Sequence, residues 1–158
     1  SKYINHLPGK KKIGFGWRGG VSGADHQERS LKEKDIEFLT SWKNTSWIDI
    51  QYLTSEDDYP EYLNENKNIY RINNSGWDLD ESIALIKSLD YVITPRQTIA
   101  HLIGSIAEKG SVLVPKRQEW RYWEKENVWE WYQNVDYKKQ KERDSWINEL
   151  EKIRNEFL

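Results

Sequence analysis

The chain has 158 residues, long enough for one domain with a hydrophobic core, and 13% of them are aromatic, which argues against disorder. Its formal net charge of −2 argues against a nonspecific nucleic-acid surface, which would need a basic face, so we expect no nucleic-acid partner. The absence of Cys excludes disulfides, thiolate metal sites and cysteine nucleophiles, and with only three His any metal cluster would need carboxylates.

A glycine-rich segment follows the first predicted strand. Residues 1–11 are expected to form a linker, and residues 12–158 a single domain. Within that domain, residues 13–17 are predicted as a strand that ends at Trp17, and Arg18 lies in the glycine-rich exit. This exit could cradle a phosphate or form a plain turn, because the spacing of its glycines does not match the dinucleotide-binding fingerprint.

The first helix is predicted from a capping box. Ser30 and Glu33 have the spacing at which two side chains satisfy backbone N–H groups at a helix start. The residues that we expect this helix to bury are Leu31, Phe38, Leu39 and Trp42. His26 and Arg29 precede the cap, so they could lie at the edge of the sheet close to the helix N-terminus. The alternative is that they belong to a solvated loop with ordinary charges.

Two further strands and a helix follow. We predict strands over residues 47–54 and 68–73, with a brief helix in the acidic stretch between them. Asp78 is predicted to cap the next helix, with Glu81 three residues on. Asp78 and Asp80 also resemble a carboxylate pair for a divalent metal, but the cap explains them better, so we expect no metal site. The apolar stripe that this helix is predicted to bury is Leu79, Ile83, Ile86 and Leu89.

The segment from Tyr91 to His101 is predicted as a buried strand, a sharp turn and the start of a helix. Residues 91–94 form a β-prone run, Pro95 cannot continue a central strand, and apolar residues then recur at helical spacing. Such a turn presents unpaired backbone N–H groups and the positive end of a helix dipole at the carboxyl edge of a sheet. We therefore expect an anionic ligand at this turn.

The rest of the chain is predicted to complete the sheet. The helix after Pro95 should end at Gly110, a residue type favoured at helix C-termini. Two strands, the second at the sheet edge, and a final helix are predicted over residues 111–115, 135–140 and 144–157. Residues 118–123 and 128–132 interleave aromatic and charged side chains, which could stack on a sugar or base, or pack a long loop against the sheet.

Strands that alternate with helices at this spacing predict a Rossmann-like α/β fold. We expect a doubly wound, mainly parallel sheet of about six strands with helices on both faces. In such a sheet a ligand binds at the carboxyl ends of the strands, near the point where the strand order reverses. The loops expected at that edge follow Trp17, Thr54, Asn73, Thr94 and Pro115.

A family resemblance adds to this interpretation. The segments that carry it are Ile13–Gly19, His26–Leu31, Asp80 with Leu89–Ile93, Ala100–Leu102 and Trp120–Trp123, in this order. From about Lys12 onward the chain resembles the C-terminal, nucleotide-sugar-binding half of GT-B glycosyltransferases, of the heptosyltransferase-like type often joined to tetratricopeptide repeats in bacteria. The resemblance implies one half of a GT-B fold, a nucleotide sugar as donor substrate with no cofactor, and an N-terminal acceptor or tetratricopeptide-repeat domain outside this chain.

The resemblance also implies the residues of the donor site. Family members carry the pattern Asp-Thr-Gly/Ala-x-x-His at the strand–helix turn, which receives the donor diphosphate, and Arg96 and Gln97 stand here in place of Asp and Thr. A guanidinium could bind phosphate bidentately, or the departure could mark a degenerate site. The donor-binding residues expected in this chain are Trp17, Arg18, His26, Arg29, Arg96, Gln97, Thr98 and His101.

By resemblance, the activity is metal-independent transfer of a sugar from a nucleoside diphosphate sugar to an acceptor hydroxyl. Fixed positive groups such as Arg29 would stabilise the charge on the leaving phosphate, and His101 could donate to a phosphate oxygen or be an ordinary, partly buried histidine. The general base would come from the missing half, so the catalytic residues stay unknown and we expect no turnover from this chain alone. The alternative is a noncatalytic domain that binds a nucleotide or glycan as a regulatory or scaffold module. A single-stranded nucleic-acid binder that uses residues 138–141 is disfavoured by the net acidity.

No segment of the sequence has the length and apolar character of a membrane span or of a signal peptide. We therefore expect a cytoplasmic protein, or one peripheral to the inner membrane.

Overall fold

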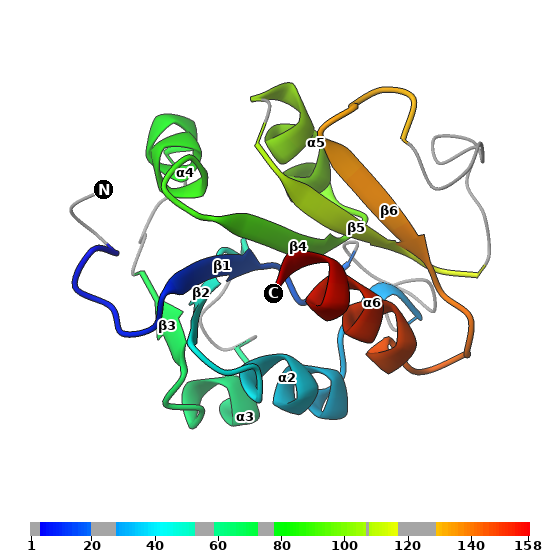
Figure 1. Ribbon diagram of the computed structural model, residues 1–158, viewed down its shortest axis with the longest axis horizontal. Coiled ribbons are helices and arrows are strands. Elements are labelled where there is room, and N and C mark those ends of the chain that lie inside the picture. The colour runs from blue at the N-terminus through cyan, green and yellow to red at the C-terminus, as the bar shows by residue number, and fades with distance from the viewer. Residues whose placement is uncertain (1–3, 20–27, 53–58, 73–77, 107, 117–128) are drawn as a thin grey trace.

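The computed structural model describes residues 4–19, 28–52, 59–72, 78–106, 108–116 and 129–158 (Figure 1). The predicted features at His26, Thr54, Asn73, Val128 and residues 118–123 lie outside these ranges.

Six strands form one parallel sheet in the described part of the chain. They are β1 (Lys11–Phe15), β2 (Thr45–Asp49), β3 (Ile69–Arg71), β4 (Tyr91–Pro95), β5 (Gly110–Val114) and β6 (Val135–Lys139). Their order across the sheet is β3-β2-β1-β4-β5-β6, and every neighbouring pair is parallel. This is the order of a doubly wound α/β fold, and it reverses between β1 and β4. The predicted Rossmann-like α/β fold is therefore confirmed.

Helices cover both faces of this sheet. Five helices lie wholly within the described ranges: α2 (Glu33–Thr40), α3 (Glu61–Asn64), α4 (Leu79–Ile86), α5 (Thr98–Ser105) and α6 (Ile147–Phe157). Figure 1 shows α4 and α5 on one face, and α2, α3 and α6 on the other. Described helices thus lie in the connections between successive strands from β1 to β5, as is usual for parallel strands.

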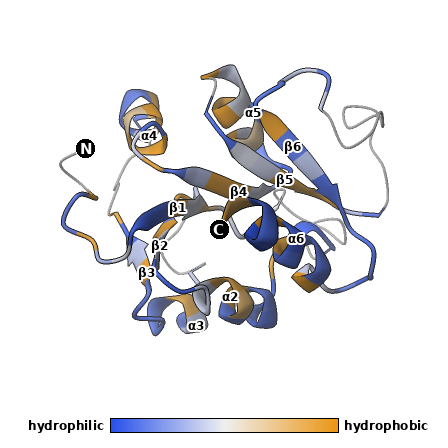
Figure 2. Cartoon of the chain, in the orientation of Figure 1, coloured by the Kyte–Doolittle hydropathy of each residue, from blue (hydrophilic) through white to orange (hydrophobic). Residues whose placement is uncertain are grey.

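The hydrophobic core consists of two clusters, one on each face. Val92 and Ile93 are neighbours in β4 and therefore point to opposite faces of the sheet. Val92 packs in the cluster that contains Ile103 of α5, whereas Ile93 packs in the cluster that contains Leu39 of α2 and Leu150 of α6. Figure 2 shows hydrophilic residues over the outward sides of α2 and α6, which leaves their apolar sides for the sheet.

The start of α2 differs from the prediction. The helix begins at Glu33 rather than at Ser30, and the carboxylate of Asp35 accepts a hydrogen bond of 2.9 Å from the backbone N–H of Lys32. Asp35 can act in this way because it lies three residues after the N-cap position, where an acidic side chain reaches back to that N–H. Ser30 instead accepts a bond of 3.2 Å from the backbone N–H of Gly19, so it supports the loop after β1.

Two other predictions at helix ends are wrong. Leu79 was expected to be buried, but it is 58% exposed because the first turn of α4 extends beyond the cluster that Leu85 and Ile86 enter. Helix α5 ends at Ser105, and Gly110 begins β5 instead of ending the helix. A Cβ atom on Gly110 would lie 2.7 Å from the carbonyl oxygen of Val92, so close packing between β4 and β5 requires glycine there.

The first residues of the chain take part in the fold. Ile4, inside the range expected as a linker, is buried in the cluster beneath α4 and α5. The amino group of Lys12 donates to the carbonyl oxygens of Leu7, Pro8 and Gly9 at 2.5–2.8 Å, which holds the preceding turn against β1.

Candidate functional site

The loops after β1 and β4 meet at the carboxyl edge of the sheet, where the strand order reverses. The backbone N–H of Gly16 donates to the carbonyl oxygen of Ile93 at 2.9 Å, so the two strands stay paired up to this edge. A Cβ atom on Gly19 would lie 2.5 Å from Cβ of Arg29 and 3.4 Å from Cβ of Pro95. The glycine therefore allows the segment that carries Arg29 to approach both loops.

Two adjacent backbone amides in the loop after β1 converge on one oxygen. The N–H groups of Trp17 and Arg18 donate to Oε1 of Gln51 at 3.1 and 2.9 Å. Successive amides that point at one acceptor form a nest, the arrangement with which many proteins bind anions. We refer to these two N–H groups as the amide nest.

Gln51 and Gln97 join the ends of three strands. Their side-chain amides exchange two hydrogen bonds of 3.2 Å, and Nε2 of Gln97 also donates to Oγ1 of Thr94 at 2.8 Å. A Cβ atom on Gly16 would clash with Nε2 of Gln97, so the two amide groups fit here because residue 16 has no side chain. We call Gln51, Gln97, Thr94 and the amide nest the edge cluster.

The N-terminus of α5 opens at the same edge. Gln97 occupies the N-cap position with an extended backbone, but its side chain turns toward Thr94 and Gln51 and does not cap the helix. Thr98 begins the helix and is exposed, and the first turn contains no acidic residue. The positive end of the helix dipole therefore lies beside the edge cluster without a carboxylate in its first turn.

The three arginines expected at the donor site differ in burial. Arg18 and Arg29 are half-buried beside the loop after β1. Arg96 is only 4% exposed, and its backbone N–H donates to the carbonyl oxygen of Leu113 at 3.3 Å. Its guanidinium thus lies inside the protein rather than on the open edge, in contrast to Thr98.

The side chain of Trp17 belongs to the core, so only the backbone of this residue lies at the edge. Its indole N–H donates to the carboxylate of buried Asp49 at 3.3 Å. Asp49 also accepts from the backbone N–H of Gln51 at 2.8 Å and from the hydroxyl of Tyr59. Burial raises the pKa of Asp49, although these bonds and the charge of Arg71 oppose the shift.

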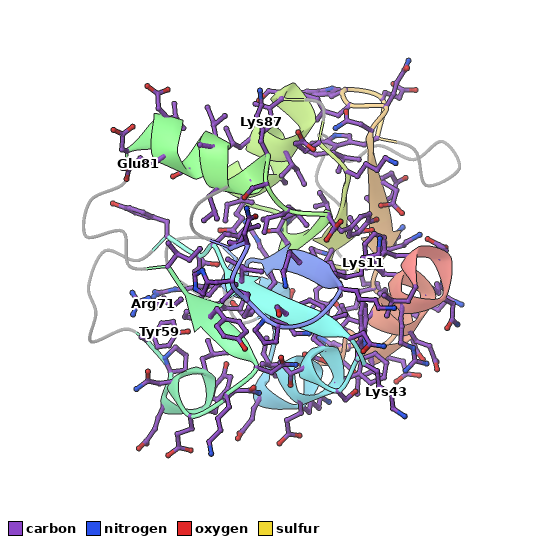
Figure 3. All side chains as sticks on the ribbon, turned by 60° about the vertical axis from the view of Figure 1, so that its left-hand side comes forward. Lys11, Lys43, Tyr59, Arg71, Glu81 and Lys87 are labelled. Carbon is purple, nitrogen blue, oxygen red and sulfur yellow. The ribbon has the colours of Figure 1, made fainter. Side chains whose placement is uncertain are left out.

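Asp49 holds together the part of the edge next to β3. The guanidinium of Arg71 lies over the ring of Tyr59, 4.3 Å from the ring centroid. Figure 3 labels these two side chains near β3. In dinucleotide-binding folds an acidic residue near this place binds a ribose hydroxyl. Here donors of the chain itself engage both carboxylate oxygens of Asp49, which makes it a support for the loops around Trp17 and Gln51.

His101 lies one turn inside α5 and packs among aromatic rings that precede β6. Its ring centroid is 5.1 Å from Trp129, 5.9 Å from Trp131 and 6.0 Å from Tyr132. Nδ1 of His101 is also 3.5 Å from the hydroxyl of Tyr132. These contacts agree with the interpretation of a partly buried histidine and with a packing role for Trp129 and Tyr132, whereas Trp131 is 53% exposed. A role for His101 at a phosphate stays a prediction.

The charged residues singled out for other functions have structural partners. Asp78 caps α4 and accepts from the backbone N–H of Asp80 at 2.9 Å, which confirms the predicted cap. The described ranges contain no group of three or more acidic or histidine side chains placed to hold a metal ion. In the lysine-rich segment, Lys138 pairs with Asp136 at 2.8 Å and with Glu156 at 2.5 Å.

The structure thus gathers part of the predicted set. The backbones of Trp17 and Arg18, together with Gln97 and Thr98, lie at the reversal of strand order, and Arg29 adjoins them through Gly19. Sequence reasoning missed Gln51. The predicted strand over residues 47–54 included this position, whereas β2 ends at Asp49, so Gln51 lies in the loop after the strand.

Comparison with family models, with curated proteins and with solved structures finds no match for this chain. The likeness to GT-B glycosyltransferases therefore rests on the sequence segments alone. Within the described ranges, no helix combines the length and the apolar character needed to cross a bilayer.

Proposed function

We propose that this domain binds a nucleoside diphosphate sugar at the carboxyl edge of its sheet, as the donor-binding half of a glycosyltransferase. The observation that carries the proposal is the convergence of backbone donors at the reversal between β1 and β4. The amide nest faces this edge from one loop, and the N-terminus of α5 opens on it from the other. Two sets of donors at one edge suit an anion with two phosphate groups.

The chemistry of sugar transfer gives these donors a reason. When the bond between sugar and diphosphate breaks, negative charge grows on the leaving phosphate, and fixed positive groups there favour the transition state. A helix N-terminus contributes about 0.3–1 kcal/mol to binding an exposed anion. The proposal gives Arg29 the stronger, charge-assisted part, because it adjoins Gly19 and Pro95 at the junction of the two loops.

A second candidate function is binding without turnover. Arg96 stands where the family pattern has a carboxylate, and its side chain is 4% exposed. A guanidinium buried to this extent is not presented to a ligand on the open edge. This observation favours a noncatalytic module that recognises a nucleotide or glycan.

Calorimetric titration of the chain with UDP, GDP and ADP tests the proposal. We expect one of the three to bind, and Arg29→Gln to weaken its affinity about tenfold or more because a charge-assisted bond is lost. Arg29→Lys should restore part of the affinity. Lys43→Ala is the matched control, because it removes the same charge from an exposed position at the opposite edge, just before β2.

Two outcomes would contradict the proposal. One is the absence of binding by all three nucleotides while the fold is retained, and the other is an equal loss of affinity in Arg29→Gln and Lys43→Ala. Activity assays with a GT-B N-terminal half supplied on the same chain would then separate the two candidates: transfer of sugar indicates the enzyme, and binding without transfer indicates the module.

A further inference from the structure

We infer that the amide nest of Trp17 and Arg18 is the receptor for one phosphate oxygen of the ligand, and that the side chain of Gln51 competes with the ligand for it. The inference deepens the proposed function and rests on it for the identity of the anion. This part of the site is separate from the strand–helix turn and from the side chains of the expected arginines. It consists of two backbone N–H groups and one neutral side chain that takes the place of the phosphate oxygen.

The two N–H groups of the nest should bind a charged phosphate oxygen more strongly than the neutral amide oxygen of Gln51. Both N–H groups donate to the neutral carboxamide oxygen of Gln51, at 3.1 and 2.9 Å. Hydrogen bonds to an ionised acceptor are roughly twice as strong as those between neutral groups. A phosphate oxygen that replaces Gln51 would therefore gain two bonds stronger than those it breaks.

Gln51 can leave the nest without unfolding the loop. Its backbone N–H is held by Asp49 at 2.8 Å, so only the side chain has to rotate. The residue is half-buried, and its neighbour Tyr52 is exposed, which leaves solvent beside the amide group. The Nε2 group donates to the backbone carbonyl of Tyr52 at 3.1 Å, a bond available outside the nest.

The partner of Gln51 is similarly exchangeable. Gln97 is half-buried and holds Gln51 through neutral amide bonds of 3.2 Å, close to the upper end of the normal range. The space for both amide groups exists because residue 16 is glycine. The side chains can therefore rearrange in this space. The loop that carries the backbone donors is held separately, because the carbonyl oxygen of Trp17 accepts from the backbone N–H of Leu31 at 2.8 Å and the buried indole of Trp17 bonds Asp49.

Competition of this kind lowers the observed affinity, because part of the intrinsic binding energy is used to displace Gln51. Removing the side chain should then tighten binding, which is the opposite of what a ligand-contacting or merely structural glutamine would show. We expect Gln51→Ala and Gln51→Asn to bind inorganic pyrophosphate about tenfold more tightly than the wild type. Asparagine keeps the amide but is one methylene too short to reach the nest.

A charged competitor should act in the reverse direction. Gln51→Glu keeps the length of the side chain and places a carboxylate against the nest, so we expect pyrophosphate to bind at least tenfold more weakly than to the wild type. Gln133→Ala removes an exposed glutamine ahead of β6 and serves as the control with unchanged affinity.

The experiment combines calorimetric titration of the chain and its variants with ¹H–¹⁵N spectra. Pyrophosphate should move the Trp17 and Arg18 amide resonances of Gln51→Ala. The inference is overturned if Gln51→Ala and Gln51→Asn retain the fold but bind pyrophosphate no better than the wild type, or bind it without a response of these two amides.

Failure of the proposed function gives a different result. If UDP, GDP and ADP bind Gln51→Ala no better than pyrophosphate does, the nest receives phosphate but the nucleotide is not recognised, so the inference stands without the function. If a nucleotide binds the wild type and all variants equally and the nest amides do not respond, the function stands without the inference.

Discussion

Two polar clusters of this protein use their hydrogen bonds in different ways. The corner cluster lies where α2 meets the start of α6 and contains the carboxylates of Asp35 and Glu149, both 0% exposed. Asp35 accepts from the backbone N–H groups of Lys32 and Trp146 at 2.9 and 3.0 Å, and Glu149 accepts from that of Lys141 at 3.1 Å. These bonds connect the first turn of one helix to the segment that leads into another.

The two glutamines of the edge cluster are neutral and only half-buried, whereas Thr94 beneath them is buried. Gln51 bonds both Gln97 and the amide nest, and the nest belongs to a loop rather than to a helix or strand. Water or a ligand can reach such groups and replace their bonds. A carboxylate in the corner cluster has no such substitute, because it is sealed between two helices.

The corner cluster and the edge cluster therefore contribute to different properties, the first to stability and the second to binding. A buried group whose partners are backbone N–H groups of its own fold holds elements together, and its loss leaves donors without acceptors. A half-buried amide bonded to a loop costs little to displace. We therefore expect substitutions in the corner cluster to change the free energy of unfolding, and substitutions in the edge cluster to change ligand affinity and local opening.

Asp35→Ala should show the largest effect on stability. The change removes the acceptor for the buried N–H of Trp146 and the cap of α2, and we expect the free energy of unfolding to fall by about 2–3 kcal/mol. The variant no longer has to bury the carboxylate of Asp35, and this gain offsets part of the loss. Urea denaturation followed by circular dichroism measures it.

Glu37→Ala provides the control for Asp35→Ala. Glu37 lies exposed on the same helix, so its removal should change stability by no more than about 0.5 kcal/mol. Similar losses in the two variants would show that the corner cluster does not hold α2 and α6 together.

Glu149→Gln should alter how stability depends on pH. Burial raises the pKa of Glu149 above its ordinary value of 4.5, so the folded state holds this proton more tightly than the unfolded chain. The resulting contribution to stability is fully present below pH 4.5 and is lost as pH rises through the folded pKa. The variant lacks this loss, so relative to the wild type it should gain stability between pH 4.5 and pH 7. The prediction is contradicted if the free energies of unfolding of the variant and the wild type, measured by urea denaturation, differ by the same amount at every pH in this range.

Much of the fold follows from patterns that are local in the sequence. Runs such as residues 91–94 and 111–114 predict buried strands, and their alternation with helical segments predicts the parallel sheet. The ends of elements are less predictable because they depend on single side chains. Asp49 ends β2 early by accepting from the N–H of Gln51, and Asp35 rather than Glu33 sets the start of α2.

The candidate site could be predicted only in part, for the same reason. Pro95 and the helix after it locate the turn, but the strand order that brings the loop after β1 beside it was not predicted and comes from the structure. The two bonds between Gln51 and the amide nest join residues that are 33 and 34 positions apart in the sequence. Nothing in the spacing of the sequence indicates such a contact. Trp17 likewise resembles a ligand-facing aromatic residue until the acceptor of its indole N–H, Asp49, is seen in the core.

Gln97→Ala should have the smallest effect on stability and a clear effect on the loop. It removes the bonds of Gln97 to Gln51 and Thr94, but water can take their place, so we expect a loss of about 1 kcal/mol or less. Because Gln51 is then held less firmly, the nest amides of Trp17 and Arg18 should exchange their hydrogens with solvent faster, as measured by NMR.

Gln140→Ala is the matched substitution outside the edge cluster. Gln140 is buried at the end of β6, and its side chain donates to the carbonyl oxygen of Ser145 at 3.2 Å on the path to α6. The same change of residue should therefore cost more stability here than at Gln97 and leave exchange at the amide nest unchanged. If Gln97→Ala costs more stability than Gln140→Ala, or leaves exchange at the nest unaltered, the edge cluster is a structural support like the corner cluster, and its amide groups are not exchangeable for a ligand.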